Sequence, residues 1–348
     1  MVNIYYDADA NLELIQKKLV AIIGYGSQSQ GHALNMQDNG CNVVIGLPTG
    51  SKSSEKVEAE GLQIVIPNAA EQAQADGLQV MTSADAAKQA DVIMIMIPDQ
   101  YHREVFERDI RPGLTSGKLV MTTSGFSLHY SQIIPPDDID VAMVAPKTPG
   151  YMMRRLFKEG VGVPALWAVH QDATGNAEAI SLAYARAIGC TRAGVLRTTI
   201  AEETETDLFG EQAVLCGGMT ALIRAGFETL VEAGYQPEVA YFECMHEMKL
   251  MADLMHQGGM NYMHYAISET AEFGDYVSGP RIIDQHVRSE MRKILQEIQN
   301  GAFATRWILE NQAGRPSFQA MRRASAQHLI EQVGRALRSM MPWLNKQD

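Results

Sequence analysis

Short apolar runs alternate with helical patterns between Leu19 and about Thr198. The runs cover residues 20–23, 43–45, 92–97, 119–122, 141–145 and 165–169, with Gly, Pro or Asp around them. Continuous apolar runs of this kind are typical of strands that are buried on both faces of a parallel sheet. We therefore predict a doubly wound α/β domain over residues 1–198.

The pattern changes at about Thr199. Apolar residues then recur at three- and four-residue spacing over long stretches, such as residues 207–231, 237–255 and 317–340, and strand-like alternation is not found. This spacing indicates helices. The predicted fold class is a Rossmann-type α/β N-terminal domain (1–198) followed by an all-α C-terminal domain (199–348).

The charge balance narrows the range of partners. The 348 residues contain 29 Lys and Arg against 41 Asp and Glu, a formal net charge of −12, which disfavours nucleic acid and anionic membranes. The N-terminus lacks a basic stretch followed by an apolar run, and no window approaches the ~20 apolar residues that span a bilayer. We expect a cytoplasmic protein that acts on a small molecule.

A glycine-rich turn follows the first predicted strand. Gly24-Tyr25-Gly26 stands before a helical stretch, where glycines let the backbone approach a pyrophosphate and free N–H groups supply an anion site. The third glycine of the usual pattern is Ser29, so helix packing must accept a slightly larger residue. We predict dinucleotide binding; the alternative is a purely structural turn.

The end of the second predicted strand bears on the choice of cofactor. It stops at Gly46, where an NAD-specific site usually offers an Asp or Glu to the ribose hydroxyl, and neither is present. Ser51, Lys52 and Ser53 follow, and two hydroxyls with an ammonium suit a 2′-phosphate. We predict NADPH, with NADH as the second choice; the alternative interpretation of the segment is a polar solvated loop.

Carboxylates recur at four-residue spacing in two places. Glu203, Asp207 and Glu211 would share one face of a helix, and Glu243 and Glu247 repeat the spacing among large apolar residues. Like charges at this spacing repel each other, and no Lys or Arg lies among the first three to offset the repulsion. Hard oxygen ligands favour Mg²⁺. We predict a magnesium site; the alternative for each pair is a solvated acidic face.

A short internal repeat lies in the N-terminal half. The sequence Glu-Gly-Leu-Gln-Ile at residues 60–64 recurs as Asp-Gly-Leu-Gln-Val at residues 76–80, 16 positions later. We interpret the repeat as a tandem insertion that lengthens a surface connection.

At residues 202–218 the chain resembles the metal-binding signature of the ketol-acid reductoisomerases. The segment reads Glu-Glu-Thr-Glu-Thr-Asp-Leu-Phe-Gly-Glu-Gln-Ala-Val-Leu-Cys-Gly-Gly. The similarity runs from Gly24 to Trp343 and includes Val144-Ala-Pro-Lys147, Tyr241-Phe-Glu-Cys244 and Gly279-Pro-Arg-Ile-Ile283. A match this long is hard to produce by chance.

The resemblance implies a short-form enzyme whose helical domain interlocks with that of a second subunit, in a homodimer or a higher homo-oligomer. Two Mg²⁺ ions would be held by Asp207 and Glu211 together with the partner subunit's Glu243 and Glu247. The substrates of the family are 2-hydroxy-2-alkyl-3-oxo acids (acetolactate and 2-aceto-2-hydroxybutyrate). An alkyl group migrates, and NADPH reduces the product to a 2,3-dihydroxy acid on the route to valine and isoleucine.

The resemblance also assigns single residues. Functional residues of the active site fall on Lys147 and Glu203, and a substrate contact falls on Ser268. The cofactor contacts, beside Gly24, are Tyr25, Gly26, Ser27, Gln28, Ser51, Ser53, Asp99, Gln100 and Gly150.

One departure concerns the chemistry directly, because Ser124 occupies the active-site position where the family has a histidine. A serine cannot carry a proton charge near neutral pH, and general acid–base assistance is typically worth ~10²–10⁴-fold in rate. Thr148 and Glu269 are further departures, and they bear on substrate fit.

Three functions remain as hypotheses. The first is reductoisomerase activity, which the carboxylates favour. The second is a divergent paralogue that acts on another acyloin or only reduces the 2-keto acid, as Ser124 would suggest. The third is a catalytically silent homologue that binds nucleotide within an assembly.

Overall fold

The computed structural model describes residues 3–48, 56–59, 62–65 and 69–341, without the side chains of residues 56–59 and 62–65. The chain separates into two compact units, residues 1–204 and 205–348. Each unit is described by itself.

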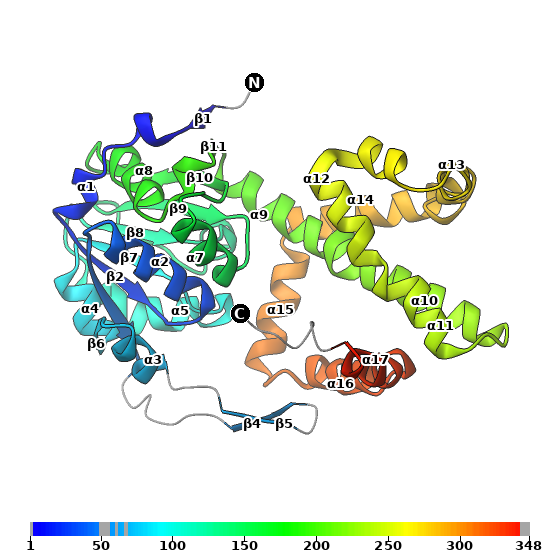
Figure 1. The fold of residues 1–348 in the computed structure, drawn as a ribbon. Helices are drawn as coiled ribbons and strands as arrows, with labels where there is room; N and C mark the ends of the chain where they lie inside the picture. Colours follow the sequence, from blue (N-terminus) through cyan, green and yellow to red (C-terminus); the bar gives the residue numbers. More distant parts are fainter. Residues whose placement is uncertain (1–2, 49–55, 60–61, 66–68, 342–348) are drawn as a thin grey trace. The chain divides into compact units, whose positions relative to one another are not determined.

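The first unit is built on a nine-stranded sheet in the order β1-β11-β10-β9-β8-β7-β2-β3-β6 (Figure 1). Its strands are β1 (Ile4–Tyr5), β2 (Leu19–Ile23), β3 (Asn42–Leu47), β6 (Gln79–Thr82), β7 (Val92–Ile95), β8 (Leu119–Thr122), β9 (Asp140–Pro146), β10 (Ala165–Gln171) and β11 (Val195–Arg197). The strands from β9 to β6 in this order are parallel to their neighbours.

All six predicted apolar runs form strands of this sheet, but the sheet is not purely parallel. β10 is antiparallel to β9, and β1 is antiparallel to β11. The chain leaves the carboxyl end of β9 and begins β10 at that same end. A hydrogen bond marks the return, since the backbone N–H of Lys147 donates to the carbonyl of Pro164 at 2.9 Å. A segment that returns to the edge it left places the next strand antiparallel.

Helices cover both faces of the sheet, as the apolar runs predicted. They are α1 (Glu13–Gln16), α2 (Ser27–Asp38), α3 (Ala69–Ala75), α4 (Ser83–Gln89), α5 (His102–Val105), α6 (Phe126–His129), α7 (Gly150–Lys158) and α8 (Ala177–Ala187), with the short turns η1 (Asp7–Asp9), η2 (Asp99–Tyr101), η3 (Phe106–Ile110), η4 (Arg111–Gly113) and η5 (Cys190–Arg192). In β2, Val20 and Ile22 join one core cluster and Ala21 and Ile23 the other. The strand is therefore apolar at every position, because both its faces are buried.

The internal repeat adopts two different structures. The described residues of its first copy, 62–64, lie in β5 (Leu62–Val65), which pairs with β4 (Lys56–Ala59) outside the main sheet. The second copy leads into β6, which pairs with β3 in the main sheet. The second copy thus occupies the place of a sheet strand, and the first adds the connection that the sequence analysis expected.

The second unit is entirely helical over its described residues. Its elements are the end of α9 (Ile200–Phe209), η6 (Gly210–Leu215), α10 (Gly217–Glu232), α11 (Pro237–Tyr241), η7 (Phe242–His246), α12 (Met248–Ala266), α13 (Glu269–Ile282), α14 (Gln285–Gln299), α15 (Ala302–Gln312), α16 (Pro316–Ala326) and α17 (Leu329–Ser339). The segments η6 and η7 are π-helical. The mixed α/β and all-α fold class is confirmed.

The two compact units meet after Thr204, six residues beyond the boundary at residue 198 that the sequence suggested. The first turn of α9 packs with the sheet unit, since Ile200 belongs to a core cluster of that unit. The buried Glu203 accepts a hydrogen bond from the backbone of Gly125. The helix therefore starts in one unit and ends in the other.

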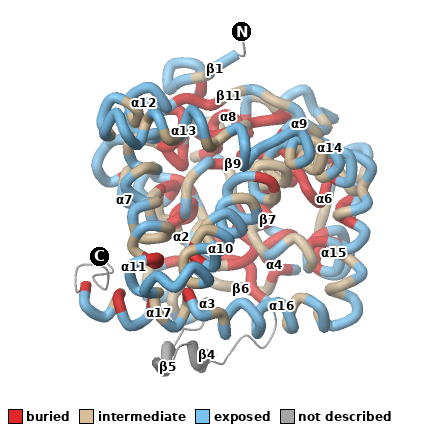
Figure 2. Tube along the Cα trace, turned by 90° about the vertical axis from the view of Figure 1, so that its right-hand side faces the viewer, coloured by how far each residue is buried: buried red, intermediate tan, exposed pale blue. Residues whose placement is uncertain are grey.

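The second unit has a small core of its own. The cluster consists of Phe227, Ala240, Tyr241, Ile330, Leu337 and Met341. Most of α10, α12 and α16 is exposed in Figure 2, and large apolar side chains such as Tyr265 (87%) and Phe273 (68%) lie on the surface. A surface this rich in apolar groups is typical of an interface.

One helical stretch of the described chain, Ile200–Glu232, is long and apolar enough to cross a membrane by length and composition, with a mean hydropathy of 1.4 in its most apolar window. The sequence analysis did not expect such a window. A single stretch of this kind is weak support for a membrane segment, and it carries Glu203, Asp207 and Glu211 near its start.

A histidine of α2 is buried against α8. His32 is fully buried, and its Nδ1 lies 2.8 Å from the hydroxyl of Tyr184, while Nε2 has no protein partner. Burial lowers the pKa of His32 to about 3. The imidazole is therefore neutral in the folded protein at physiological pH.

We predict that His32 makes the fold acid-sensitive. Below pH ~6.5 the unfolded chain binds a proton at this histidine that the folded chain does not bind, so stability falls until the pH reaches about 3, by ~1.4 kcal/mol per pH unit. In His32→Asn, urea unfolding between pH 7 and 4 should show a shallower loss than in the parent protein. The exposed His286→Asn serves as the control, and equal slopes in all three proteins would contradict the assignment.

Candidate cofactor and active site

The glycine-rich turn lies at the carboxyl end of β2, as predicted. Gly24 has φ +101°, and a Cβ there would come within 2.7 Å of the carbonyl oxygen of Met96. Both the dihedral angle and the space require glycine. Gly26 is the N-cap of the 12-residue helix α2. The first N–H groups of the helix have no partner within it, and they are directed at the glycine-rich turn.

Ser29 explains how the turn tolerates the loss of its third glycine. Its side chain is buried, and its hydroxyl accepts from the N–H of Gly26 at 2.6 Å and donates to the carbonyl of Gly26 at 3.1 Å. The serine therefore caps α2 from inside.

Gly150 brings a second helix start against this turn. It begins α7, and a Cβ on it would lie 2.4 Å from the backbone C and O of Ser27 and 2.5 Å from the Cα of Gln28. The N-termini of α2 and α7 can approach each other this closely only because residue 150 has no side chain. Gly150 and the predicted residues 24–28 thus form one cluster.

Tyr25 is anchored by a residue that the sequence analysis did not single out. Its hydroxyl donates to Asp76 at 2.7 Å, and Gln30 donates to the same carboxylate oxygen at 2.7 Å. Burial alone would raise the pKa of Asp76, but hydrogen bonds from Tyr25, Gln30 and Gln72 outweigh it and lower this pKa. Burial, together with the hydrogen bond and the charge of Asp76, raises the pKa of Tyr25. The phenol is therefore a fixed donor.

Asp99 and Ser124 meet at the carboxyl ends of β7 and β8. The hydroxyl of Ser124 donates to Asp99 Oδ1 at 3.2 Å, and both residues are half-buried. Two predicted site residues, 25 positions apart in the chain, are thus brought together. Gln100 follows Asp99 in the turn η2.

Glu203 and Lys147 form an ion pair beside Ser124. Lys147 Nζ lies 3.0 Å from Glu203 Oε1, and the backbone N–H of Gly125 donates to Glu203 Oε2 at 2.8 Å. Glu203 is 1% exposed, whereas the lysine side chain is 36% exposed. The pair is therefore buried at its carboxylate and partly exposed at its lysine.

The four carboxylates predicted to bind metal lie at the two π-helical segments. Asp207 lies in the last turn of α9 and Glu211 in η6, while Glu243 lies in η7 and Glu247 follows it. A π-helical turn is wider than an α-helical one and occurs frequently at functional sites.

A single chain does not bring the two carboxylate pairs together. Gly226 of α10 packs against Cys244 of η7, where a Cβ would lie 3.2 Å from Sγ. Asp207 is 19 residues before Gly226 on the same helical stretch, which corresponds to roughly 25–30 Å. Among the described residues no group of three or more His, Cys, Asp or Glu is arranged to hold a metal ion.

The remaining predicted site residues are the substrate contact and two of the cofactor contacts. Ser268 is exposed and caps α13, since its hydroxyl accepts from the N–H of Ala271 at 3.2 Å. Ser51 and Ser53, with Lys52 between them, lie outside the described residues.

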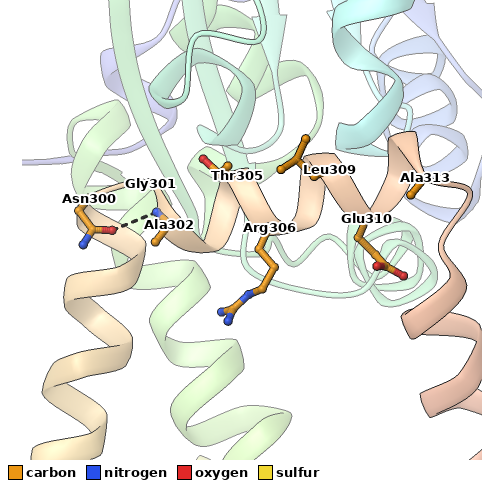
Figure 3. A pocket seen from close by; sticks show the side chains of 8 residues that line it. All are labelled: Asn300, Gly301, Ala302, Thr305, Arg306, Leu309, Glu310 and Ala313. Atoms are coloured by element: carbon orange, nitrogen blue, oxygen red, sulfur yellow. Dashed lines mark hydrogen bonds between the residues drawn. The ribbon is translucent and has the colours of Figure 1, made fainter.

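Several clefts lie on the described part of the chain. A cleft of about 340 Å³ lies at the ends of β3 and β6, next to Leu47 and Pro48. Another of about 630 Å³ lies beside α6 and the start of α9, and a third of about 630 Å³ follows α15. In the third cleft Arg306 and Glu310 point to the same side of α15 (Figure 3).

Family models match both halves of the chain. The model described as "Acetohydroxy acid isomeroreductase, NADPH-binding domain" matches residues 14–71 and 67–194, and "Ketol-acid reductoisomerase, C-terminal domain" matches residues 200–343. The two pieces of the first match meet at residues 67–71, between the two copies of the internal repeat.

The chain is also similar to solved structures. An NADH-preferring ketol-acid reductoisomerase from an uncultured archaeon is 41% identical, with a TM-score of 0.89, over 97% of this chain and 99% of that one. A semialdehyde dehydrogenase NAD-binding protein from Cupriavidus necator (16% identical, TM-score 0.58, 82% and 99% covered) shares the fold. So does a pyrroline-5-carboxylate reductase from Coxiella burnetii (13%, 0.51, 82% and 97%).

We predict that Gly150→Ala weakens dinucleotide binding. The new Cβ would displace backbone atoms of Ser27 and Gln28, and overpacking of this kind costs about 1–3 kcal/mol, equivalent to about 5- to 150-fold in Kd. Titration of NADPH fluorescence measures the effect. The control is Gly274→Ala, where a Cβ meets nothing within 4 Å. Equal Kd values for both variants would contradict the close-approach argument.

Proposed function

This chain belongs to the ketol-acid reductoisomerase family, and we propose that it works as a magnesium-dependent, NADPH-using homodimer. Its family makes it an NAD(P)-dependent oxidoreductase with coupled isomerase activity in branched-chain amino acid biosynthesis. The observation that carries the residue assignments is the cluster of Asp99, Ser124, Lys147 and Glu203 at one edge of the sheet. We place the enzyme in the cytoplasm.

The sheet order supports a direction for the bound cofactor. From β2 the chain continues to β3 and β6 on one side, and β7, β8 and β9 follow on the other, so the strand order reverses at β2. Ligands of such sheets bind at this switch point, with the pyrophosphate at the first helix. We therefore place the pyrophosphate at residues 24–28, the adenosine over β3 and the nicotinamide towards Asp99 and Ser124.

NADPH is proposed as the preferred cofactor, with NADH as the second choice. Leu47 and Pro48 follow Gly46, so the described end of β3 carries no carboxylate that would repel a 2′-phosphate. The nearby Arg108 is already paired with Asp109 and Glu104, at 2.8 and 2.7 Å. The charge for the phosphate would therefore come from Lys52. The archaeal relative is NADH-preferring, which keeps the second choice open.

The metal site is proposed to need two chains. Asp207 and Glu211 would share two Mg²⁺ ions with the partner subunit's Glu243 and Glu247. Carboxylates are the hard oxygen ligands that Mg²⁺ prefers, so the residues fit the ion. When bound, Mg²⁺ would act as a Lewis acid on the oxygens of the substrate. The exposed apolar side chains of the helical unit are the surface that a second copy would cover.

The ion pair positions a cation for the substrate. Glu203 is buried and accepts a hydrogen bond from Gly125, so it fixes the ammonium of Lys147, whose side chain is 36% exposed. Such an ammonium stabilises negative charge that develops on a substrate oxygen without needing to move. We propose this role for Lys147 and a positioning role for Glu203.

Ser124 has a narrower role than a histidine. Its hydroxyl hydrogen is committed to Asp99, so it can accept one hydrogen bond from substrate or cofactor but does not supply a proton at neutral pH. This limit keeps a second candidate function open. A paralogue that only reduces the 2-keto acid would need hydride transfer but no alkyl migration.

The test of the function is NADPH oxidation by the purified chain with Mg²⁺ and racemic 2-acetolactate. We expect turnover in the parent protein and its loss in Asp207→Asn, which removes the charge of one proposed metal ligand. Asp253→Asn is the matched control, because Asp253 is an exposed partner of Lys249 one turn away on α12. Oxidation with the rearranged keto acid but not with acetolactate would instead establish the paralogue.

We predict that Ser124→His accelerates turnover of acetolactate. A histidine beside Asp99 could exchange a proton near neutral pH, and such assistance is worth ~10²–10⁴-fold where it operates. Reduction of the rearranged keto acid should change less, so the ratio of the two rates is the measurement. A variant slower on both substrates would mean that the site is adapted to serine.

A further inference from the structure

A buried histidine lies directly behind the Ser124 site and has no part in the proposed function. His102 is 3% exposed and follows Asp99 by three residues, at the start of α5. Its Nε2 lies 2.7 Å from the carbonyl oxygen of Ile97, and its Nδ1 lies 2.8 Å from the hydroxyl of Ser127. The same Nδ1 is 3.9 Å from Asp99 Oδ1.

The partners determine which nitrogen carries the hydrogen. A carbonyl oxygen can only accept, so Nε2–H of His102 donates to Ile97. Burial lowers the pKa of His102, although the charge of Asp99 and the bond to Ile97 raise it. In the neutral ring Nδ1 therefore accepts from the hydroxyl of Ser127. Both nitrogens are engaged, so the imidazole cannot itself reach a substrate.

Two hydrogen bonds between side chains consequently join the segment that follows β7 to the segment that follows β8. One runs from Ser124 to Asp99 and the other from Ser127 to His102. Ser127 is fully buried, so its bond is shielded from water. The two segments carry Asp99, Gln100 and Ser124, which flank the proposed nicotinamide end of the cofactor.

We propose that His102 is a positioning residue. Through Ser127 it holds the segment after β8, which carries Ser124, in place against the segment after β7, which carries Asp99, and so orients the nicotinamide for hydride transfer. The inference rests on the proposed function, because it takes the placement of the nicotinamide from it. It assigns a role to an imidazole in a chain whose expected active-site histidine is a serine.

Two substitutions separate the two bonds of the ring. In His102→Asn the amide oxygen stands near the position of Nδ1 and still accepts from Ser127, whereas the bond to Ile97 is lost. In His102→Gln the amide nitrogen stands near Nε2 and still donates to Ile97, whereas the bond to Ser127 is lost. Ser127→Ala removes the second bond from its other end.

The experiment uses the full chain with Mg²⁺ and NADPH, and the rearranged keto acid as substrate. His102→Gln and Ser127→Ala should each lower kcat by about 10- to 100-fold, because misplacement by about 1 Å costs up to that much. KM for NADPH should change little, since adenosine and pyrophosphate are held elsewhere. The double variant should be no slower than either single one, and His102→Asn should be clearly faster than His102→Gln. Exposed His286→Gln is the control.

Equal kcat in His102→Gln and the parent, or equal losses in His102→Asn and His102→Gln, would overturn the inference. If the parent itself does not turn over, the proposed function has failed, and the inference is measured by the fluorescence anisotropy of bound NADPH. His102→Gln and Ser127→Ala should then lower the anisotropy at unchanged Kd. Parent-like anisotropy in both would overturn it.

Discussion

The geometry of the site depends on one buried charge. The carboxylate of Glu203 has lost its hydration, which is costly unless hydrogen bonds and an opposite charge replace it. Gly125 and Lys147 provide both, from the connection after β8 and from the end of β9. The first turn of α9 therefore fixes where these two segments lie, and with them the position of the Lys147 ammonium.

The layers of the first unit could be predicted from the apolar pattern, and its edges could not. Strands such as β2 are buried on both faces and are apolar throughout, so a run of four residues identifies them. β1 and β11 contain two and three residues and leave no pattern. The direction of β10 depends on where residues 147–164 return to the sheet, which is a property of tertiary contacts.

The site shows the same distinction between local and distant signals. Gly24 stands out because the turn is contiguous with a strand and a helix, and Ser124 stood out through the family resemblance. Asp76 and His102 were missed, because a bond between residues 51 or 25 positions apart has no signature in the residues between them. A histidine three residues after Asp99 was the one signal available in the sequence. The π-helical turns at the carboxylates were likewise invisible, since residue spacing alone cannot distinguish a turn that closes at four residues from one that closes at five.

The duplicated segment gives this enzyme two chemically similar candidates for a single strand position. Because β6 begins with Gln79 and Val80 of the second copy, the first copy contributes no strand to the main sheet and is free to diverge. It follows directly the residues at which the ribose end of the cofactor is expected. Natural selection can therefore rewrite a loop beside the nucleotide site while an intact duplicate keeps the domain folded, which separates the evolution of cofactor choice from the evolution of stability.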